Sequence, residues 1–147
     1  MHHRWLMFLL GALILPAAIL GTSAAVQSRA VPSDCAGRDA WTRESSTRLA
    51  NAEGAAGSVD RLNGASADAM QSVANSYAKA ASEQKASNPP ASDAKVSELL
   101  VVYFQYMSDN WNGWIDNPYV SVHNYLQTQA LDKQLRDAQK AAEVHCT

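Results

Sequence analysis

Only two cysteines occur among the 147 residues, and no C-x-x-C pair is present. Cys35 and Cys146 lie at opposite ends of the chain that follows an apolar N-terminal stretch. An even count in an oxidising compartment predicts one disulfide between them, closing a loop of about 110 residues. The alternative is a redox or metal-binding thiol acting with His145. The missing C-x-x-C spacing gives that alternative no support.

Charge is absent between Trp5 and Ser28, directly after the short basic start that ends at Arg4. A basic start, an apolar run of about fifteen residues and then small residues are typical of a secretory signal peptide, here residues 1–25. The uncharged stretch also reaches the roughly twenty residues needed to span a bilayer. Residues 5–26 as an uncleaved membrane anchor are therefore the alternative. Both interpretations predict that the rest of the chain is extracytoplasmic, either secreted or periplasmic.

Excess positive charge is also missing. After the leader, all 14 acids and 11 of the 12 bases remain, a net charge of 11 − 14 = −3. Phosphate backbones require a basic surface, so we expect no nucleic-acid partner. We expect membrane contact only through the N-terminal segment. Residues 26–34 are predicted to be a short linker, and 35–147 are long enough for a single domain with a modest core.

An alternating strand pattern is absent after Ser33, where alanine is abundant and β-branched residues are few. Helix-breaking signals occur at Gly64, at Pro89 and at Gly113. They predict four helices of about 28, 22, 20 and 28 residues. Ser33 is expected to cap the first helix.

Four helices joined by short loops favour antiparallel packing, which brings the start of the first beside the end of the last. The predicted disulfide requires the same arrangement, so the expected fold is an all-α antiparallel four-helix bundle closed by one disulfide. The alternative is a long two-rod helical hairpin that turns at Pro89 and Pro90 and dimerises. In either case the alanine-rich stretch 50–58, with Gly54 and Gly57, is expected to let a neighbouring helix approach closely.

Lysine and arginine are missing between Lys95 and Lys133, where seven of the nine aromatic residues of the exported part occur. Aromatic faces and carboxylates together suit a small cationic ligand such as a polyamine, and tryptophan with Asp or Asn suits a sugar. Gly113 predicts that residues 109–119 form a loop. The candidate ligand-binding residues are Asp109, Trp111, Trp114, Asp116 and Tyr119.

Other chemistry finds little support in the sequence. The stretch "DNWNG" departs from a calcium loop because tryptophan stands at its third position and glycine at its fifth. His123 and His145 share a predicted helix but lie 22 residues apart, so we expect no metal site. Asp109 and Asp116 could serve as acid and base, but no nucleophile motif accompanies them. We expect no catalytic residue and no cofactor.

The sequence therefore predicts an exported helical binding or structural module of the cell envelope, and not an enzyme. Its ligand is expected to be a small cation or a sugar, or else a protein partner. A partner-binding or self-assembling protein that uses its alanine-rich faces, in the simplest case as a homodimer, is the alternative. A hydrolase-like enzyme using Asp109 and Asp116 is the third hypothesis.

Overall fold

The structure is a computed structural model that describes residues 32–60, 64–117 and 122–147, with the side chains of 122–125 excepted. The predicted leader and most of the predicted linker lie outside the described residues. Four α-helices and two short 3-10 turns make up the described part, which contains no strand. In chain order they are η1 (Ser33–Cys35), α1 (Arg38–Gly57), α2 (Ala67–Ala86), η3 (Ala91–Asp93), α3 (Ala94–Asp116) and α4 (Val122–Cys146).

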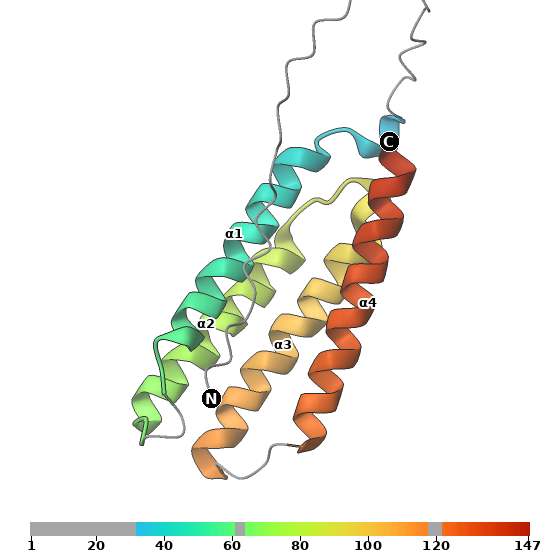
Figure 1. The fold of residues 1–147 in the computed structure, drawn as a ribbon. Helices are drawn as coiled ribbons and strands as arrows, with labels where there is room; N and C mark the ends of the chain where they lie inside the picture. Colours follow the sequence, from blue (N-terminus) through green and yellow to red (C-terminus); the bar gives the residue numbers. More distant parts are fainter. Residues whose placement is uncertain (1–31, 61–63, 118–121) are drawn as a thin grey trace, which may run out of the picture.

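Consecutive helices run in opposite directions, so the predicted all-α antiparallel four-helix bundle is confirmed (Figure 1). The two-rod hairpin is wrong because the chain also reverses between α1 and α2. Ser66 caps α2 as its side chain accepts a hydrogen bond from the Ala69 amide at 3.1 Å. Three predicted helix boundaries differ from those in the structure: both ends of α1 and the end of α3.

Helix α1 begins and ends inside its predicted limits. Ser33 does not cap it, because Ser33 opens the 3-10 turn that carries Cys35. Gly37, with φ of 76°, then separates this turn from the helix. At the other end, α1 stops at Gly57, where two glycines in one turn make the helix costly to continue.

Helix α3 continues through Gly113 to Asp116, so the predicted break at this glycine is wrong. A glycine inside a helix costs only about 1 kcal/mol, which tertiary packing readily offsets. Trp111 belongs to the hydrophobic core, and Trp114 packs against that core one turn later. Their burial favours continued helix on both sides of Gly113.

Helices α2 and α3 form the centre of the bundle, with α1 packed on α2 and α4 packed on α3. The most deeply buried large side chains of this centre are Phe104 of α3 and Tyr77 of α2, which are 0% and 2% exposed. Alanines at 74, 80 and 81 of α2 are also buried, and their small size lets α3 approach closely. The outer helices α1 and α4 are not a closely packed pair along their lengths.

Cys35 and Cys146 form the predicted disulfide, with a Cα–Cα distance of 5.8 Å. The bond joins the turn before α1 to the last residue of α4, and it indicates an oxidising compartment outside the cytoplasm. Within the described residues, no helix combines the length and the apolar character needed to cross a membrane.

Gly54 and Gly37 should respond in opposite directions to alanine. The expected close approach of a helix at Gly54 and Gly57 is wrong for the described residues, none of which outside α1 has an atom within 4 Å of a Cβ added at either position. Gly54→Ala should therefore raise the free energy of unfolding by about 1 kcal/mol, through helix propensity alone. Gly37 has equal space but a positive φ, so Gly37→Ala should lower it by about 1 kcal/mol.

Urea unfolding followed by far-UV circular dichroism measures both changes, and the two glycines serve as controls for each other. A loss of stability in Gly54→Ala would show that another surface covers this part of α1.

Candidate functional site

Four of the five predicted ligand-binding residues lie on the last two turns of α3, and Tyr119 lies outside the described residues. The interpretation of 109–119 as a loop is therefore wrong as far as Asp116. Trp111 is 3% exposed, and its ring meets the half-buried Trp114 ring edge-on at a centroid distance of 5.0 Å. Trp111 is thus a core residue, because α3 turns it inward into the hydrophobic core. Binding by the remaining residues stays a prediction.

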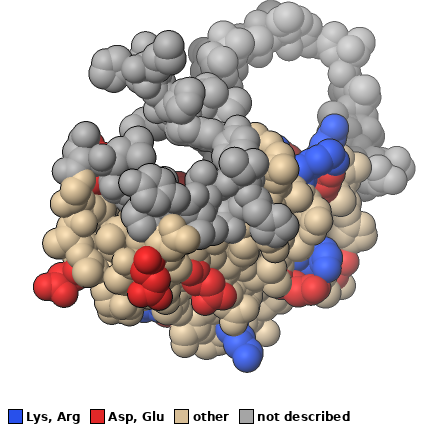
Figure 2. Space-filling view, turned by 90° about the horizontal axis from the view of Figure 1, so that it is seen from below, with Lys and Arg blue, Asp and Glu red and all other residues tan. Residues whose placement is uncertain are grey.

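The end of the bundle that carries Asp116 is rich in acids. Asp60 follows α1, Asp68 lies in the first turn of α2, and Asp116 ends α3, so all three belong to this end. Figure 2 views the molecule from this end, with acidic side chains across the left and centre of the visible face and basic ones toward its right and lower edges. The predicted acidic character of this region therefore extends to the surface.

Asp109 and Asp116 do not face each other across a cleft. Both are exposed on α3, seven residues apart, which is about 10 Å along a helix at 1.5 Å per residue. Asp109 lies instead on an open groove between α2 and α3, whose lining also includes Lys85. A segment that is free of bases in the sequence thus acquires a base from a neighbouring helix. This placement lends no support to an acid–base pair or to a cation site at Asp109.

A second group of acids lies midway along the bundle, where we define the acid–tyrosine cluster as Glu53, Tyr77, Tyr103 and Asp132. Each of the four helices contributes one of these residues. The Tyr103 hydroxyl and the Glu53 carboxylate are hydrogen-bonded, and Asp132 of α4 acts on both residues electrostatically. Tyr77 is buried and interacts with both Tyr103 and Glu53. The cluster therefore joins the outer helices α1 and α4 through the tyrosines of the central pair.

Burial and like charge both act on Glu53. Glu53 is an exposed residue, but the neighbouring helices partly desolvate its carboxylate, and this desolvation is the first cause that raises its pKa above the ordinary value of 4.5. The negative charge of Asp132 raises the pKa further, while the hydrogen bond from Tyr103 lowers it. Desolvation also raises the pKa of Tyr77 and of Tyr103, so both hydroxyls stay protonated at neutral pH. Ionised Glu53 is thus held at a cost that a nearby positive charge would reduce.

Glu53 was not among the residues predicted from the sequence, although Tyr103 and Asp132 lie within the base-free segment that was singled out. Glu53 lies on α1, about 80 residues before Asp132, and no local motif connects them. Its position in the stretch "ANAEGAAGS", where it is the one charged residue among small ones, was the available signal.

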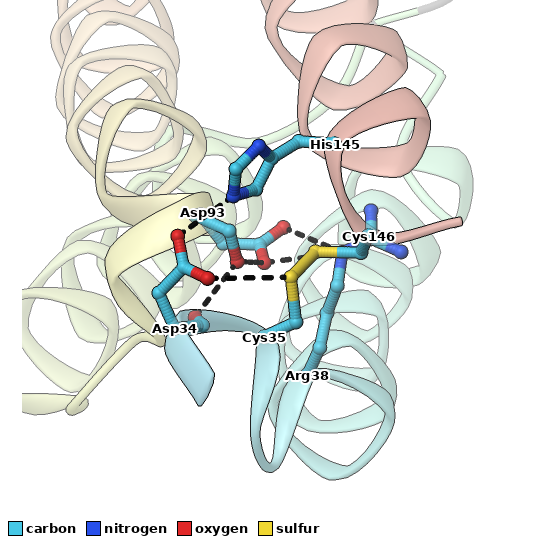
Figure 3. Close-up of polar contacts among 7 residues, drawn as sticks. Asp34, Cys35, Arg38, Asp93, His145 and Cys146 are labelled. Atoms are coloured by element: carbon cyan, nitrogen blue, oxygen red, sulfur yellow. Dashed lines mark hydrogen bonds and ion pairs between the residues drawn. A yellow bond between two sulfur atoms is a disulfide. The ribbon is translucent and has the colours of Figure 1, made fainter. Parts of the chain in front are cut away.

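A third polar group surrounds the disulfide, and we define the disulfide junction as Asp34, Cys35, His145 and Cys146 (Figure 3). His145 Nε2 lies 2.7 Å from Asp34 Oδ2, which joins the turn η1 to the end of α4 a second time. The Cys35 sulfur is 3.9 Å from Asp34 Oδ1. Because this sulfur is bonded to Cys146 it has no proton to donate, so this contact is not a hydrogen bond.

Arg38 and Asp93 form a buried ion pair behind the junction (Figure 3). The Arg38 Nε lies 3.2 Å and 3.1 Å from the two carboxylate oxygens of Asp93, which is only 2% exposed. The Ser92 hydroxyl lies 2.8 Å from Asp93 Oδ2 and 3.1 Å from the Asp34 carbonyl oxygen. These contacts fix both η1 and the start of α1 against η3, and so hold Asp34 and Cys35 in place.

Comparison with models of known protein families, with curated proteins and with solved structures finds no match. The class of this protein is therefore defined by its own architecture, an antiparallel four-helix bundle whose first turn and last helix are joined by a disulfide. Function has to be argued from the residues themselves.

Proposed function

We propose that this chain is an exported, disulfide-closed helical binding module of the cell envelope, and that its ligand is a small organic cation such as a polyamine. The acid–tyrosine cluster is the ligand surface that the geometry favours. Export follows from the basic and apolar N-terminal sequence together with the disulfide, which requires an oxidising compartment. We regard residues 1–25 as the signal peptide.

The observation that carries the ligand class is the electrostatic repulsion that Asp132 of α4 exerts on Glu53 of α1, although Asp132 is also paired with Arg136 one turn along its own helix. Two like charges held near each other in a partly desolvated setting raise each other's free energy. A bound ammonium group would remove this repulsion and would gain hydrogen bonds from the carboxylates. The Tyr103 ring at the same place offers a further attraction for a cation. Aromatic and acidic chemistry thus coincide here more closely than they do around Asp109.

Spermidine binding, measured by isothermal titration calorimetry, tests this proposal. Wild type should bind with one site per chain, and Glu53→Gln or Asp132→Asn should each weaken binding about three- to tenfold, equal to roughly 0.7–1.4 kcal/mol. Asp137→Asn is the matched control: Asp137 pairs with Lys133 as Asp132 pairs with Arg136, but it lies outside the cluster, so this substitution should leave binding unchanged.

The pH dependence has a definite sign. Because the pKa of Glu53 is raised, its ionised form is reached at higher pH than in the unfolded chain. Because the folded protein holds the Glu53 proton more tightly than the unfolded chain does, protonation of Glu53 stabilises the fold. This stabilisation is fully present below the pKa of Glu53 in the unfolded chain, and it is lost as pH rises through the pKa of Glu53 in the folded protein. Spermidine binds the ionised form, so affinity should increase as pH rises through that same range, with release of a proton on binding. Equal affinity across this range, or equal loss in Asp137→Asn, would contradict the proposal.

Cell-wall sugars are the ligands that the end of α3, with Trp114 and Asp116, would favour. The same calorimetry with soluble peptidoglycan fragments distinguishes the two surfaces. Binding of fragments but not of spermidine, with sensitivity to Trp114→Ala and not to Glu53→Gln, would move the ligand site to the α3 end.

Self-association through α1 is the second candidate function. The helix exposes small residues along one side, including Ala50, Gly54 and Gly57, and no other part of the described chain covers the two glycines. Such a surface allows a second helix to approach closely. Sedimentation equilibrium over a hundredfold range of concentration tests it, with Gly54→Leu as the blocking variant. A monomer at every concentration would exclude this candidate.

A further inference from the structure

The disulfide junction brings together four side chains with potential metal-ligand atoms, and none of the four belongs to the acid–tyrosine cluster. The ligand atoms of Asp34, Cys35 and His145 lie within 4.8 Å of one another, and the Cys146 sulfur is bonded directly to that of Cys35. Two of these residues come from η1 and two from the end of α4, so their meeting depends on the fold and not on a local motif. Two sulfurs, one imidazole and one carboxylate form a donor set that zinc prefers.

While the disulfide is intact, the junction offers only two charged or basic ligands. A disulfide sulfur carries no negative charge, whereas the thiolate is the form of cysteine that binds metals. His145 and Asp34 then satisfy each other at 2.7 Å. The oxidised protein is therefore a poor metal site.

We propose that reduction of the Cys35–Cys146 disulfide converts this junction into a tetrahedral zinc site with Cys35, Cys146, His145 and Asp34 as ligands. A dithiol reductant transfers two electrons and two protons to the sulfurs and becomes a cyclic disulfide itself. Zinc then replaces the two thiol protons, which are released to solvent, and it also separates the Asp34–His145 pair. The inference is independent of the proposed cation-binding function.

The geometry favours this conversion. Tetrahedral Zn–S bonds of about 2.3 Å place two thiolate sulfurs about 3.8 Å apart. The 5.8 Å between the two Cα atoms allows this separation with small side-chain movements. The contact of Ser92 with the Asp34 carbonyl oxygen ties η1 to η3, and the Arg38–Asp93 ion pair ties the start of α1 to η3, both without using the sulfurs. The ligands on η1 therefore keep their support when the disulfide opens.

Metal binding by the reduced protein tests the proposal. The full chain without its leader is reduced with a phosphine, which is oxidised to its oxide with the oxygen of one water, and is titrated with Co²⁺ and then Zn²⁺ in the absence of oxygen. We expect one metal per chain, a thiolate-to-cobalt charge-transfer band, and the intense visible bands of tetrahedral cobalt, all removed by Zn²⁺. The oxidised protein should bind at least about tenfold more weakly and give no charge-transfer band.

Two variants distinguish a built site from binding by the thiols alone. His145→Ala and Asp34→Asn should each weaken Zn²⁺ binding at least about tenfold, and His145→Ala should change the visible cobalt bands. Asp39→Asn, an exposed acid one turn further along, should have no effect. Equal binding by wild type and both variants would overturn the proposal.

The proposal can be tested even if reduction unfolds the chain, because circular dichroism and the thermal midpoint are measured in the same samples as metal binding. If reduction unfolds the protein, Zn²⁺ should restore its helices in wild type and fail to do so in His145→Ala. Metal bound without recovery of helix, or no binding at one equivalent, would show that the junction is only a structural disulfide.

Discussion

Removal of the disulfide should produce the largest loss of stability available to a simple substitution in this chain. Cys35 and Cys146 are separated by 111 residues, and chain-entropy reasoning gives about 4–5 kcal/mol for closing a loop of this size. The fold makes this contribution important, because α1 packs on α2 and α4 packs on α3, whereas the outer helices lack an extensive interface with each other. The bond restricts the unfolded chain more than it adds contacts to the folded one.

Urea unfolding of the Cys35→Ser, Cys146→Ser variant measures this loss. Reduced wild type, in metal-free buffer, is the control: it keeps both sulfur atoms and should lose about the same free energy. A larger loss in the serine variant alone would come from packing around Cys35, which is 5% exposed. The dependence of free energy on urea should also steepen without the bond, because the unfolded chain expands. A loss below about 1 kcal/mol would contradict the chain-entropy account.

Arg38→Met should cause the second largest loss, toward the lower end of about 3–5 kcal/mol. This substitution keeps the apolar stem of the side chain, removes the guanidinium, and leaves the Asp93 carboxylate without its partner in a site that is only 2% exposed. Removing one member of a buried pair is costly because the remaining charge stays desolvated. The lower end applies because the Arg38 side chain is 23% exposed, so part of the attraction is already screened by solvent.

A double-mutant cycle isolates this effect. Asp93→Asn should cost less than Arg38→Met, because the arginine left behind can reach water and the buried carboxylate is gone. The double variant should be more stable than the sum of the two single losses predicts, by about 1–3 kcal/mol. Arg43→Met, at an exposed position on the same helix, should change stability by less than about 0.5 kcal/mol. Additive losses would show that the two side chains act independently.

Local signals in the sequence predicted most of the helices. Ser66 caps α2 directly after the predicted break at Gly64, and Pro89 and Pro90 separate α2 from the turn that precedes α3. Such signals act over three or four residues, so they hold in almost any tertiary context. Gly113 was interpreted by the same reasoning, and that prediction was wrong. The free-energy cost of a glycine within a helix is small, and the stabilisation gained by burying Trp111 in the same stretch of helix exceeds that cost.

The charge pairs show the same division between local and tertiary effects. An i,i+4 pair was available to Arg38 with Asp34, but Arg38 instead binds the buried Asp93 and Asp34 contacts His145. Glu44 of the same helix is exposed and does form the local pair with Arg48, whose guanidinium also donates to the buried Gln84 of α2. A buried, desolvated partner attracts a charge more strongly than an exposed neighbour does, so tertiary position decided which pair formed.

The sequence by itself determined the helical class, the number of helices and the single disulfide. Composition and helix-ending residues act over a few neighbouring residues, and two cysteines allow only one disulfide within the chain. Only the tertiary structure decided that Glu53 meets Tyr103 and Asp132, and that His145 meets Asp34. These partners lie on different helices, and the register in which the helices dock depends on the packing of the whole core around Tyr77 and Phe104. Both candidate sites were therefore decided by packing, which no short stretch of sequence encodes.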